Sequence, residues 1–383
     1  MLPEGWKYSN LGEFASNITS GSRDWAQYYS DTGDKFVRMT NLARDGVKIS
    51  ENDMKFVSIP HDSTDGKRTA LKNGDILISI TAELGKIGLV PNGFGTAFIN
   101  QHLALVRLKT ATASSTFVAY ALSSKKLNQK LNSLNDAGAK AGLNLSTIRS
   151  IPILLPPLPE QKKIAAILST WDRAIEGTEK LLANSQQQKK ALMQQLLTGK
   201  KRLPGFTGEW ETKYLGDIAD IQTGSSNRQD SLTNGEYTFF DRSEDIRTSN
   251  RYLFDCEAVI VPGEGQDFVP KYFVGKFDLH QRTYAISCFQ ACDGKFIFYT
   301  VGYHRSHFLS QAVGSTVKSL RLPMFQKMPL KLPPLSEQRA IAAVLTTADE
   351  EITALESDLS RLRQEKKALM QQLLTGKSRV KVD

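Results

Sequence analysis

The sequence predicts an α+β fold: two mixed α/β globular domains separated by two long antiparallel helices that form a coiled coil, arranged as a pseudo-twofold tandem repeat. Three observations support this prediction. Residues 155–200 and 332–377 repeat each other at an offset of 177 residues without a gap, and 28 of their 46 positions are identical. Both copies place apolar residues at helical spacing. The segments before the copies alternate short apolar runs with turn residues, which is typical of strands.

Each copy of the repeat carries the start and stop signals of one long helix. Pro159 suits a first helical turn, where its missing N–H has no cost, and Ser336 at the matching place can cap the second helix directly. Gly199 and Gly376 are placed as the glycines that end helices in a left-handed conformation. About 39 residues lie between these signals, which at 1.5 Å per residue is roughly 58 Å of helix.

The apolar residues of each copy recur at alternating intervals of four and three, which is a heptad pattern. The predicted helix–helix seam consists of Ile164, Leu168, Trp171, Ile175, Leu182, Leu192 and Leu196 in the first copy and Ile341, Leu345, Ile352, Leu355, Leu359, Leu362, Leu369 and Leu373 in the second. Lys189 and Lys366 also occupy seam positions, where a long apolar stem can pack while the charge reaches water. Each stripe needs a partner, and the nearest one is the other copy.

The direction of the two helices follows from the segment between them. Residues 203–331 would form a globule with a radius of gyration of about 14 Å. A globule of that size does not carry the chain back along roughly 58 Å of helix. The end of the first helix and the start of the second are therefore expected to be neighbours, which makes the helices antiparallel.

The repeat divides the chain into four predicted segments: a globular domain at 1–154, a long helix at 155–202, a second globular domain at 203–331 and a second long helix at 332–383. Both globular segments open with Leu-Pro, a tryptophan and then Gly-Ser, and they diverge beyond that point. Within the first segment we expect strands at 76–80, 87–90, 98–99 and 103–108, one helix at 115–134 and a flexible loop at 137–143.

Composition limits the class of protein. The formal charge of +9 allows a polyanionic partner, although the segment 203–331 carries 14 Lys and Arg against 15 Asp and Glu. No apolar run is long enough to span a bilayer, and the first residues lack the pattern of a signal peptide. The three cysteines, Cys256, Cys288 and Cys292, are too few for a disulfide framework and fit a reducing cytoplasm.

Motifs that would indicate catalysis by this chain do not occur. The Pro-Pro pairs precede leucine, so the Asn/Asp-Pro-Pro-Tyr/Phe motif of amino-methyltransferases is missing. The end of the chain resembles the last part of a phosphate loop, but Gln371 stands where the loop needs glycine. Cys288 and Cys292 with His280 lack a suitably spaced fourth ligand, so a metal site is not expected.

The repeated boxes LPPLPEQ and LPPLSEQ, each followed by a long helix and KKALMQQLLTGK, resemble the specificity subunit of a type I restriction–modification enzyme across essentially the whole chain. The resemblance implies that each globular segment is a target recognition domain for one half of an asymmetric, bipartite double-stranded DNA site. It implies that the paired helices are a ruler and a platform for two methyltransferase subunits. It also implies that S-adenosylmethionine, ATP and Mg belong to methyltransferase and restriction/translocase partner subunits, so this chain binds no cofactor of its own.

Candidate DNA contacts are polar and basic residues of loops in the two globular segments. Lys and Arg supply phosphate contacts, whereas Asn, Gln and Arg can read base edges in the major groove. The candidates in the first segment are Ser22, Arg23, Trp25, Arg38, Asn41, Lys67, Arg68, Asn100 and Gln101. The candidates in the second segment are Asn227, Arg228, Gln229, Arg242, Arg247, Arg251, Gln266, His280, Gln281 and Arg282.

Two other functions fit the same sequence. A coiled-coil scaffold that binds proteins through both globular segments would need no DNA contact. A DNA-recognition subunit of a stand-alone methyltransferase would lack the restriction partner but would have the same sequence features. The effector lies outside this chain, so both alternatives remain open at this stage.

Overall fold

The computed structural model describes residues 2–23, 25–60, 63–133, 142–243 and 245–382. The chain forms two compact units: unit one comprises Met1–Gly177 and Leu359–Asp383, and unit two comprises Thr178–Asp358. Each unit therefore contains one globular segment, the first half of one long helix and the last half of the other. We call the globular segments head one (residues 1–154) and head two (residues 203–331).

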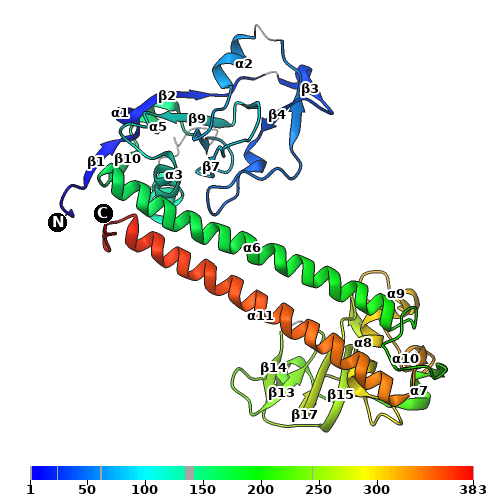
Figure 1. Ribbon diagram of the computed structural model, residues 1–383. Coiled ribbons are helices and arrows are strands. Elements are labelled where there is room, and N and C mark those ends of the chain that lie inside the picture. The colour runs from blue at the N-terminus through cyan, green and yellow to red at the C-terminus, as the bar shows by residue number, and fades with distance from the viewer. Residues whose placement is uncertain (1, 24, 61–62, 134–141, 244, 383) are drawn as a thin grey trace. The chain divides into compact units, whose positions relative to one another are not determined.

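The two long helices have the predicted length and ends. Helix α6 spans Leu158–Leu196 and helix α11 spans Leu335–Leu373, 39 residues each (Figure 1). Gly199 and Gly376 follow them with φ of +70° and +73°, which confirms the predicted left-handed ends. The predicted cap at Ser336 is wrong, because α11 begins one residue earlier and Ser336 lies inside its first turn.

Packing within each unit confirms that the two long helices run antiparallel. In unit one, Ile164 and Leu168 near the start of α6 share a hydrophobic core with Leu373 at the end of α11. In unit two, Ile341 and Leu345 near the start of α11 share a core with Leu196 at the end of α6. All fifteen predicted seam residues are buried or half-buried.

Head one begins with a short antiparallel pair, in which β1 (Lys7–Asn10) pairs with β10 (Pro152–Leu155) just before α6. One four-stranded sheet has the order β2 (Ala15–Ser20), β9 (Leu103–Leu108), β6 (Ile76–Ser79), β7 (Ile87–Leu89). A second sheet has the order β3 (Tyr29–Ser30), β5 (Lys55–Val57), β4 (Asp34–Val37), β8 (Ala97–Ile99). The four predicted strands of this head are confirmed as β6, β7, β8 and β9.

The helices of head one differ from the prediction at one point. The helix predicted over 115–134 is broken at Ser124, whose φ of −62° and ψ of 141° are extended, and Ser124 separates two helices. The helical segments are α1 (Leu11–Phe14), α2 (Thr64–Thr69), α3 (Ser115–Ser123), α4 (Lys125–Ser133), α5 (Leu145–Arg149) and the 3₁₀ turns Trp25–Tyr28 and Met39–Asn41. Most of the loop predicted at 137–143 lies outside the described residues.

Head two has the same opening pair and a larger sheet. Strand β11 (Glu211–Tyr214) pairs with β20 (Pro329–Leu332) before α11. The six-stranded sheet has the order β12 (Asp220–Thr223), β18 (Thr283–Ser287), β15 (Phe254–Pro262), β17 (Lys271–Leu279), β13 (Tyr237–Phe240), β14 (Arg247–Ser249). The remaining elements are the pair β16 (Glu264–Gly265) and β19 (Lys318–Ser319), helices α7 (Leu215–Ile218), α8 (Gly294–Tyr303), α9 (Arg305–Gln311) and α10 (Leu322–Gln326), and the 3₁₀ turn Arg228–Asp230.

The sheets of the two heads differ chiefly by a break in one strand, and head one also has the short edge strand β3. In head two, β17 pairs along its length with β15, and its last residues pair in parallel with β13. In head one these two pairings belong to separate strands: β7 pairs antiparallel with β6, and β8 pairs in parallel with β4. Pro91, Gly93 and Gly95 lie between β7 and β8, and both glycines have positive φ. Proline and left-handed glycines interrupt a strand, so two smaller sheets replace one.

Candidate nucleic-acid interface

Both heads contain the same tight turn where a strand that pairs in parallel ends. Residues 100–102 form the head-one turn after β8, and residues 280–282 form the head-two turn after β17. The Asn100 side chain accepts a hydrogen bond from the His102 backbone N–H at 3.2 Å, and His280 Nδ1 accepts one from the Arg282 backbone N–H at 3.1 Å. The residue after each turn, Leu103 or Thr283, donates its backbone N–H to the carbonyl of the first turn residue. Different residues therefore build one backbone conformation.

A Gly-Ser loop packs directly against each turn. Ser22 forms an isolated parallel bridge with Asn100, and Ser226 forms one with His280. A Cβ atom on Gly21 would lie 2.0 Å from the Asn100 carbonyl oxygen, and one on Gly224 would lie 1.7 Å from the oxygen of Leu279. Only glycine allows this approach of two backbones. The glycine of each Gly-Ser pair thus positions the loop beside the turn, and the bridging serine is Ser22 of the pair in head one and Ser226, one residue after the pair, in head two.

In head one, Arg68 connects the Gly-Ser loop to helix α2. Its guanidinium donates to the Thr19 hydroxyl at 2.8 Å, to the Ser22 hydroxyl, and to the Asp65 carboxylate at 3.2 Å. The Ser22 hydroxyl, together with Arg68, lowers the pKa of Asp65. Lys67 beside Arg68 is exposed. Ser22, Arg68 and the head-one turn consequently lie together.

In head two, acidic residues hold several of the candidate arginines. Glu264 pairs with Arg242 at 3.4 Å and also with Arg282. Arg251 donates to the Ser226 hydroxyl and lies 3.5 Å from the Asp278 carboxylate. These contacts gather three arginines around the head-two turn.

Burial and the charged groups around His280 together lower the pKa of its imidazole. Burial is the main cause that lowers its pKa, and Arg242 and Arg282 act in the same direction, while Asp241 and Glu264 oppose them. The side chain of Arg247 pairs with Asp241 at 3.3 Å. The imidazole is therefore favoured in its neutral form within a strongly charged loop cluster.

Two predicted DNA-binding residues lie in the interior of head one, which argues against a direct DNA contact. Trp25 is 5% exposed, and its ring centroid lies 4.8 Å from that of Phe36 and 5.6 Å from that of Phe98. Asn41 is 1% exposed; it accepts a hydrogen bond from the Arg38 backbone N–H and donates one to the Ser50 carbonyl.

The other candidates are at least partly accessible. Arg38 pairs with Asp53 at 2.9 Å and remains partly exposed. Gln281 Nε2 donates to Asn227 Oδ1 at 2.7 Å, so the head-two turn also contacts the loop after Ser226. The candidates whose side chains are exposed without being gathered at a turn are Arg23, Arg228, Gln229 and Gln266.

A polar network that the sequence interpretation missed ties each head to both long helices. In unit one, the Tyr120 hydroxyl of α3 donates to Asp172 Oδ2 of α6 at 2.5 Å, and Lys366 Nζ of α11 lies 2.5 Å from Asp172 Oδ1. In unit two, the Tyr299 hydroxyl of α8 donates to Asp349 at 2.7 Å, and Lys189 of α6 pairs with the same carboxylate. We call these two networks the Tyr–Asp–Lys joints.

The Tyr–Asp–Lys joints change the interpretation of the two seam lysines. Burial and then the Asp172 hydrogen bond raise the pKa of Tyr120, and burial is also the main cause that raises the pKa of Tyr299. The lysines do not simply extend into water, because each one pairs with an aspartate of the other helix. A signal was present in the sequence: both the aspartate and the lysine recur at the offset of 177 residues.

The Glu-Gln pair of each repeated box is buried at the start of its helix. Glu160 accepts from the Trp6 indole at 3.2 Å and from Arg379 at 2.8 Å, while Glu337 accepts from Arg202 at 2.6 Å. The following glutamines, Gln161 and Gln338, bond the backbone at the start of α3 and α8. These boxes therefore anchor the head to the helix.

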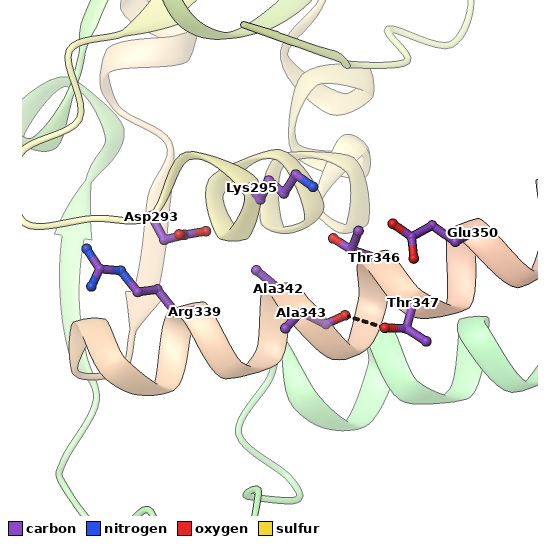
Figure 2. Close-up of a pocket in the computed structure, with 8 residues that line it drawn as sticks. All are labelled: Asp293, Lys295, Arg339, Ala342, Ala343, Thr346, Thr347 and Glu350. Atoms are coloured by element: carbon purple, nitrogen blue, oxygen red, sulfur yellow. Dashed lines mark hydrogen bonds between the residues drawn. The ribbon is translucent and has the colours of Figure 1, made fainter.

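A shallow groove lies where α11 begins against α8 in unit two (Figure 2). Figure 2 shows small side chains along its floor, with Arg339 and Asp293 at one end and Glu350 at the other. Its lining is Asp293, Lys295, Arg339, Ala342, Ala343, Thr346, Thr347 and Glu350. In the part of the chain that the structure describes, no three His, Cys, Asp or Glu residues are placed to hold a metal ion.

The family model of the type I restriction modification DNA specificity domain matches residues 3–184 and 207–362. The chain belongs to this family. Its two matched segments begin within the two heads and continue into the long helices that follow them. DNA sequence recognition is the function of the specificity subunits in this family.

Two relatives show how far the similarity extends. The MjaVIII specificity subunit of Methanocaldococcus jannaschii is 24% identical over 418 aligned positions, covering 99% of this chain and 94% of the relative. The EcoDI specificity subunit of Escherichia coli is 29% identical over 167 residues, which cover 44% of this chain and only 37% of that subunit. The similarity therefore extends over the whole chain in one case and over about half of it in the other.

Solved structures share the fold. The S subunit of a type I restriction-modification system from M. genitalium has a TM-score of 0.69 at 14% identity, covering 96% of both chains. The HsdS subunit from Thermoanaerobacter tengcongensis has a TM-score of 0.50 at 19% identity over 98% of both chains. Among the described residues, no helix is long and apolar enough to cross a membrane.

Proposed function

We propose that this chain is the non-catalytic specificity subunit of a DNA methyltransferase and restriction complex. Each head would read one half of an asymmetric, bipartite DNA site. The observation that supports this most directly is that two heads of different sequence build the same turn beside a Gly-Ser loop, with arginines gathered around it. A shared framework with different side chains is what two related but unequal half-sites require.

The long helices would set the spacing of the two half-sites. Each is a continuous helix of 39 residues, or roughly 58 Å. The readable face of DNA recurs about every 34–36 Å, so two reading heads need a fixed separation. The Tyr–Asp–Lys joints support this role, because an ion pair in the seam favours one register of the helices over others.

Partner subunits would supply the chemistry. We infer that two methyltransferase subunits bind S-adenosylmethionine and methylate the DNA, and that restriction/translocase subunits use ATP and Mg. A DNA-recognition subunit that serves a methyltransferase alone is the nearest alternative. Purifying the complex from its host and identifying its subunits distinguishes the two, because only the first contains a translocase.

The decisive experiment maps methylated adenines in the host genome with and without this chain. We expect a split, asymmetric motif to lose its methylation when the chain is deleted and to regain it when the chain is restored. Methylation that is unchanged by the deletion would contradict DNA recognition by this subunit. A salt titration of DNA binding by the complex provides a second measurement, in which specific affinity falls steeply as salt rises.

The spacing role has its own test. Adding about one helical turn, roughly four residues, to one long helix should change the spacer of the methylated motif and leave both half-sites unchanged. If the half-site bases change while the spacer stays the same, the helices do not act as a ruler.

A further inference from the structure

We propose that Gln101 and Gln281, the middle residues of the two turns, each read an adenine in the major groove at corresponding positions of the two half-sites. The proposal rests on the proposed function, because it requires that the heads bind DNA. It goes further by naming one specificity-determining residue in each head and the base that it recognises.

The equivalence of the two positions is structural. The residue before each glutamine forms a bridge to a serine of the Gly-Ser loop: Ser22 in head one, and in head two Ser226, which follows the Gly224-Ser225 pair. Its side chain accepts a hydrogen bond from the backbone N–H of the residue after the glutamine. The residue after that donates its N–H to the carbonyl of the first turn residue, at 3.2 Å in head one and 3.0 Å in head two. The backbone on both sides of each glutamine is thus held in the same way.

The two turns share the middle glutamine but differ at the residues on either side of it. The first turn residue is Asn100 in one head and His280 in the other, and the third is His102 or Arg282. The first residue needs only an acceptor atom, which either side chain provides. The side chain of the middle residue takes no part in these bonds. The Gln281 backbone N–H donates to the Ser226 carbonyl at 2.9 Å, but any residue except proline could make that bond, so the turn does not explain why the residue is glutamine in both heads.

The internal contacts of the two glutamines are not shared. Gln101 Nε2 lies 3.1 Å from His102 Nε2, whereas Gln281 Nε2 donates to Asn227 Oδ1 at 2.7 Å. A common structural requirement would give a common partner. Each present partner is a single polar side-chain atom, in a contact that is partly buried for Gln101 and exposed for Gln281. A base edge can replace either partner without leaving a fully buried group unpaired.

The chemistry of the side chain selects the base. A glutamine amide offers one acceptor oxygen and one donor nitrogen in a plane, and these match the N6 donor and N7 acceptor of adenine in the major groove. Basic residues lie nearby for phosphate contacts. In head one Arg68 bonds Ser22, and the exposed Lys67 precedes it in the chain; in head two Arg242 and Arg282 both pair with Glu264. Phosphate contacts fix the position of a protein on DNA, and the glutamine then reads one base.

The test uses the full chain in complex with its methyltransferase subunits and a DNA library in which one half-site at a time is randomised. For Gln101→Ala we expect the preference for adenine at one position of the first half-site to fall by roughly 10- to 100-fold, with the second half-site unchanged. Gln281→Ala should have the reciprocal effect. The control Gln290→Ala, at an exposed loop position outside the turn, should leave both half-sites unchanged.

A second pair of variants keeps the proposal falsifiable if an alanine variant unfolds. Gln101→Glu and Gln281→Glu replace the amide donor with an acceptor, which suits the N4 donor of cytosine. We expect the preference at the same position to move from adenine to cytosine. An unchanged preference, or binding that weakens equally for all four bases, would overturn the proposal. If the unmodified complex showed no site preference at all, the proposed function itself would fail, and this outcome is distinct.

Discussion

Removing the carboxylate of the unit-one joint tests whether the Tyr–Asp–Lys network holds the helices together. In Asp172→Ala, Lys366 loses its ion-pair partner, and the Tyr120 hydroxyl loses its acceptor at 2.5 Å and keeps the Ser169 hydroxyl at 3.3 Å. The Lys366 side chain is only 10% exposed, so its charge would stay largely buried without a partner. Breaking a buried pair typically costs 3–5 kcal/mol, and the 37% exposure of Asp172 reduces this, so we expect about 2–3 kcal/mol.

The unit-two joint provides an internal comparison. Lys189 is 24% exposed, more than twice as exposed as Lys366, so water can solvate its charge once Asp349 is gone. We therefore expect Asp349→Ala to destabilise unit two by about 1–2 kcal/mol. Replacing the exposed Lys163 on α6 by alanine should change stability by less than about 0.5 kcal/mol.

Urea unfolding of the full chain measures these effects, followed by tryptophan fluorescence for unit one and by far-UV circular dichroism for both units together. Three tryptophans, Trp6, Trp25 and Trp171, lie in unit one and only Trp210 lies in unit two, so the signal reports mainly on unit one. The double variant Asp172→Ala, Lys366→Met should recover part of the lost stability, because no unpaired charge then remains in the seam. If the stability losses of Asp172→Ala and Lys366→Met, measured singly, simply add in the double variant, the reasoning about the pair is refuted.

Three further outcomes follow from single residues. Gly21→Ala and Gly224→Ala should each destabilise their own head by about 3 kcal/mol in thermal or urea unfolding, since the added Cβ meets a backbone carbonyl. Gly177→Ala should stabilise α6 by about 0.5–1 kcal/mol, because no atom outside the helix lies near the new methyl group; a loss of stability would contradict this. The pKa of His280 is lowered from 6.5 in the folded state, so stability should decline as pH falls through 6.5 toward the folded pKa, and His280→Asn, which copies Asn100 of head one, should reduce that decline in urea titrations at several pH values.

The long helices could be predicted from the sequence because their signals are local and repeated. A heptad stripe, a proline in the first turn and a terminal glycine each act within a few residues, and the second copy of the repeat confirms the first. Ser336 shows the limit of this reasoning. A serine near a helix start can cap it, but the structure begins the helix one residue earlier, and its first-turn N–H groups at residues 337 and 338 bond the Pro334 carbonyl.

The heads were harder to predict because their contacts are not local. Trp25 follows two polar residues in the sequence and resembles a loop residue, but it packs among Phe36 and Phe98, which come from other strands. The break at Ser124 similarly depends on an extended backbone that periodicity does not reveal. The pairing of arginines with Glu264 and Asp278 also depends on tertiary structure, so the sequence predicts the residue types of the interface and not their partners.

The joints give a physical reason for the two helices to keep matching residues at these positions although the heads differ. Lys366 of the second copy pairs with Asp172 of the first, and Lys189 of the first copy pairs with Asp349 of the second. The lysine of each copy finds its aspartate partner in the other copy. Replacing one aspartate therefore leaves a lysine of the other copy unpaired. The loop contacts of each head, such as the bridge between Ser22 and its turn, stay within that head. A substitution there has no counterpart to match in the other half, which leaves each head free to acquire a different set of base contacts on the same turn.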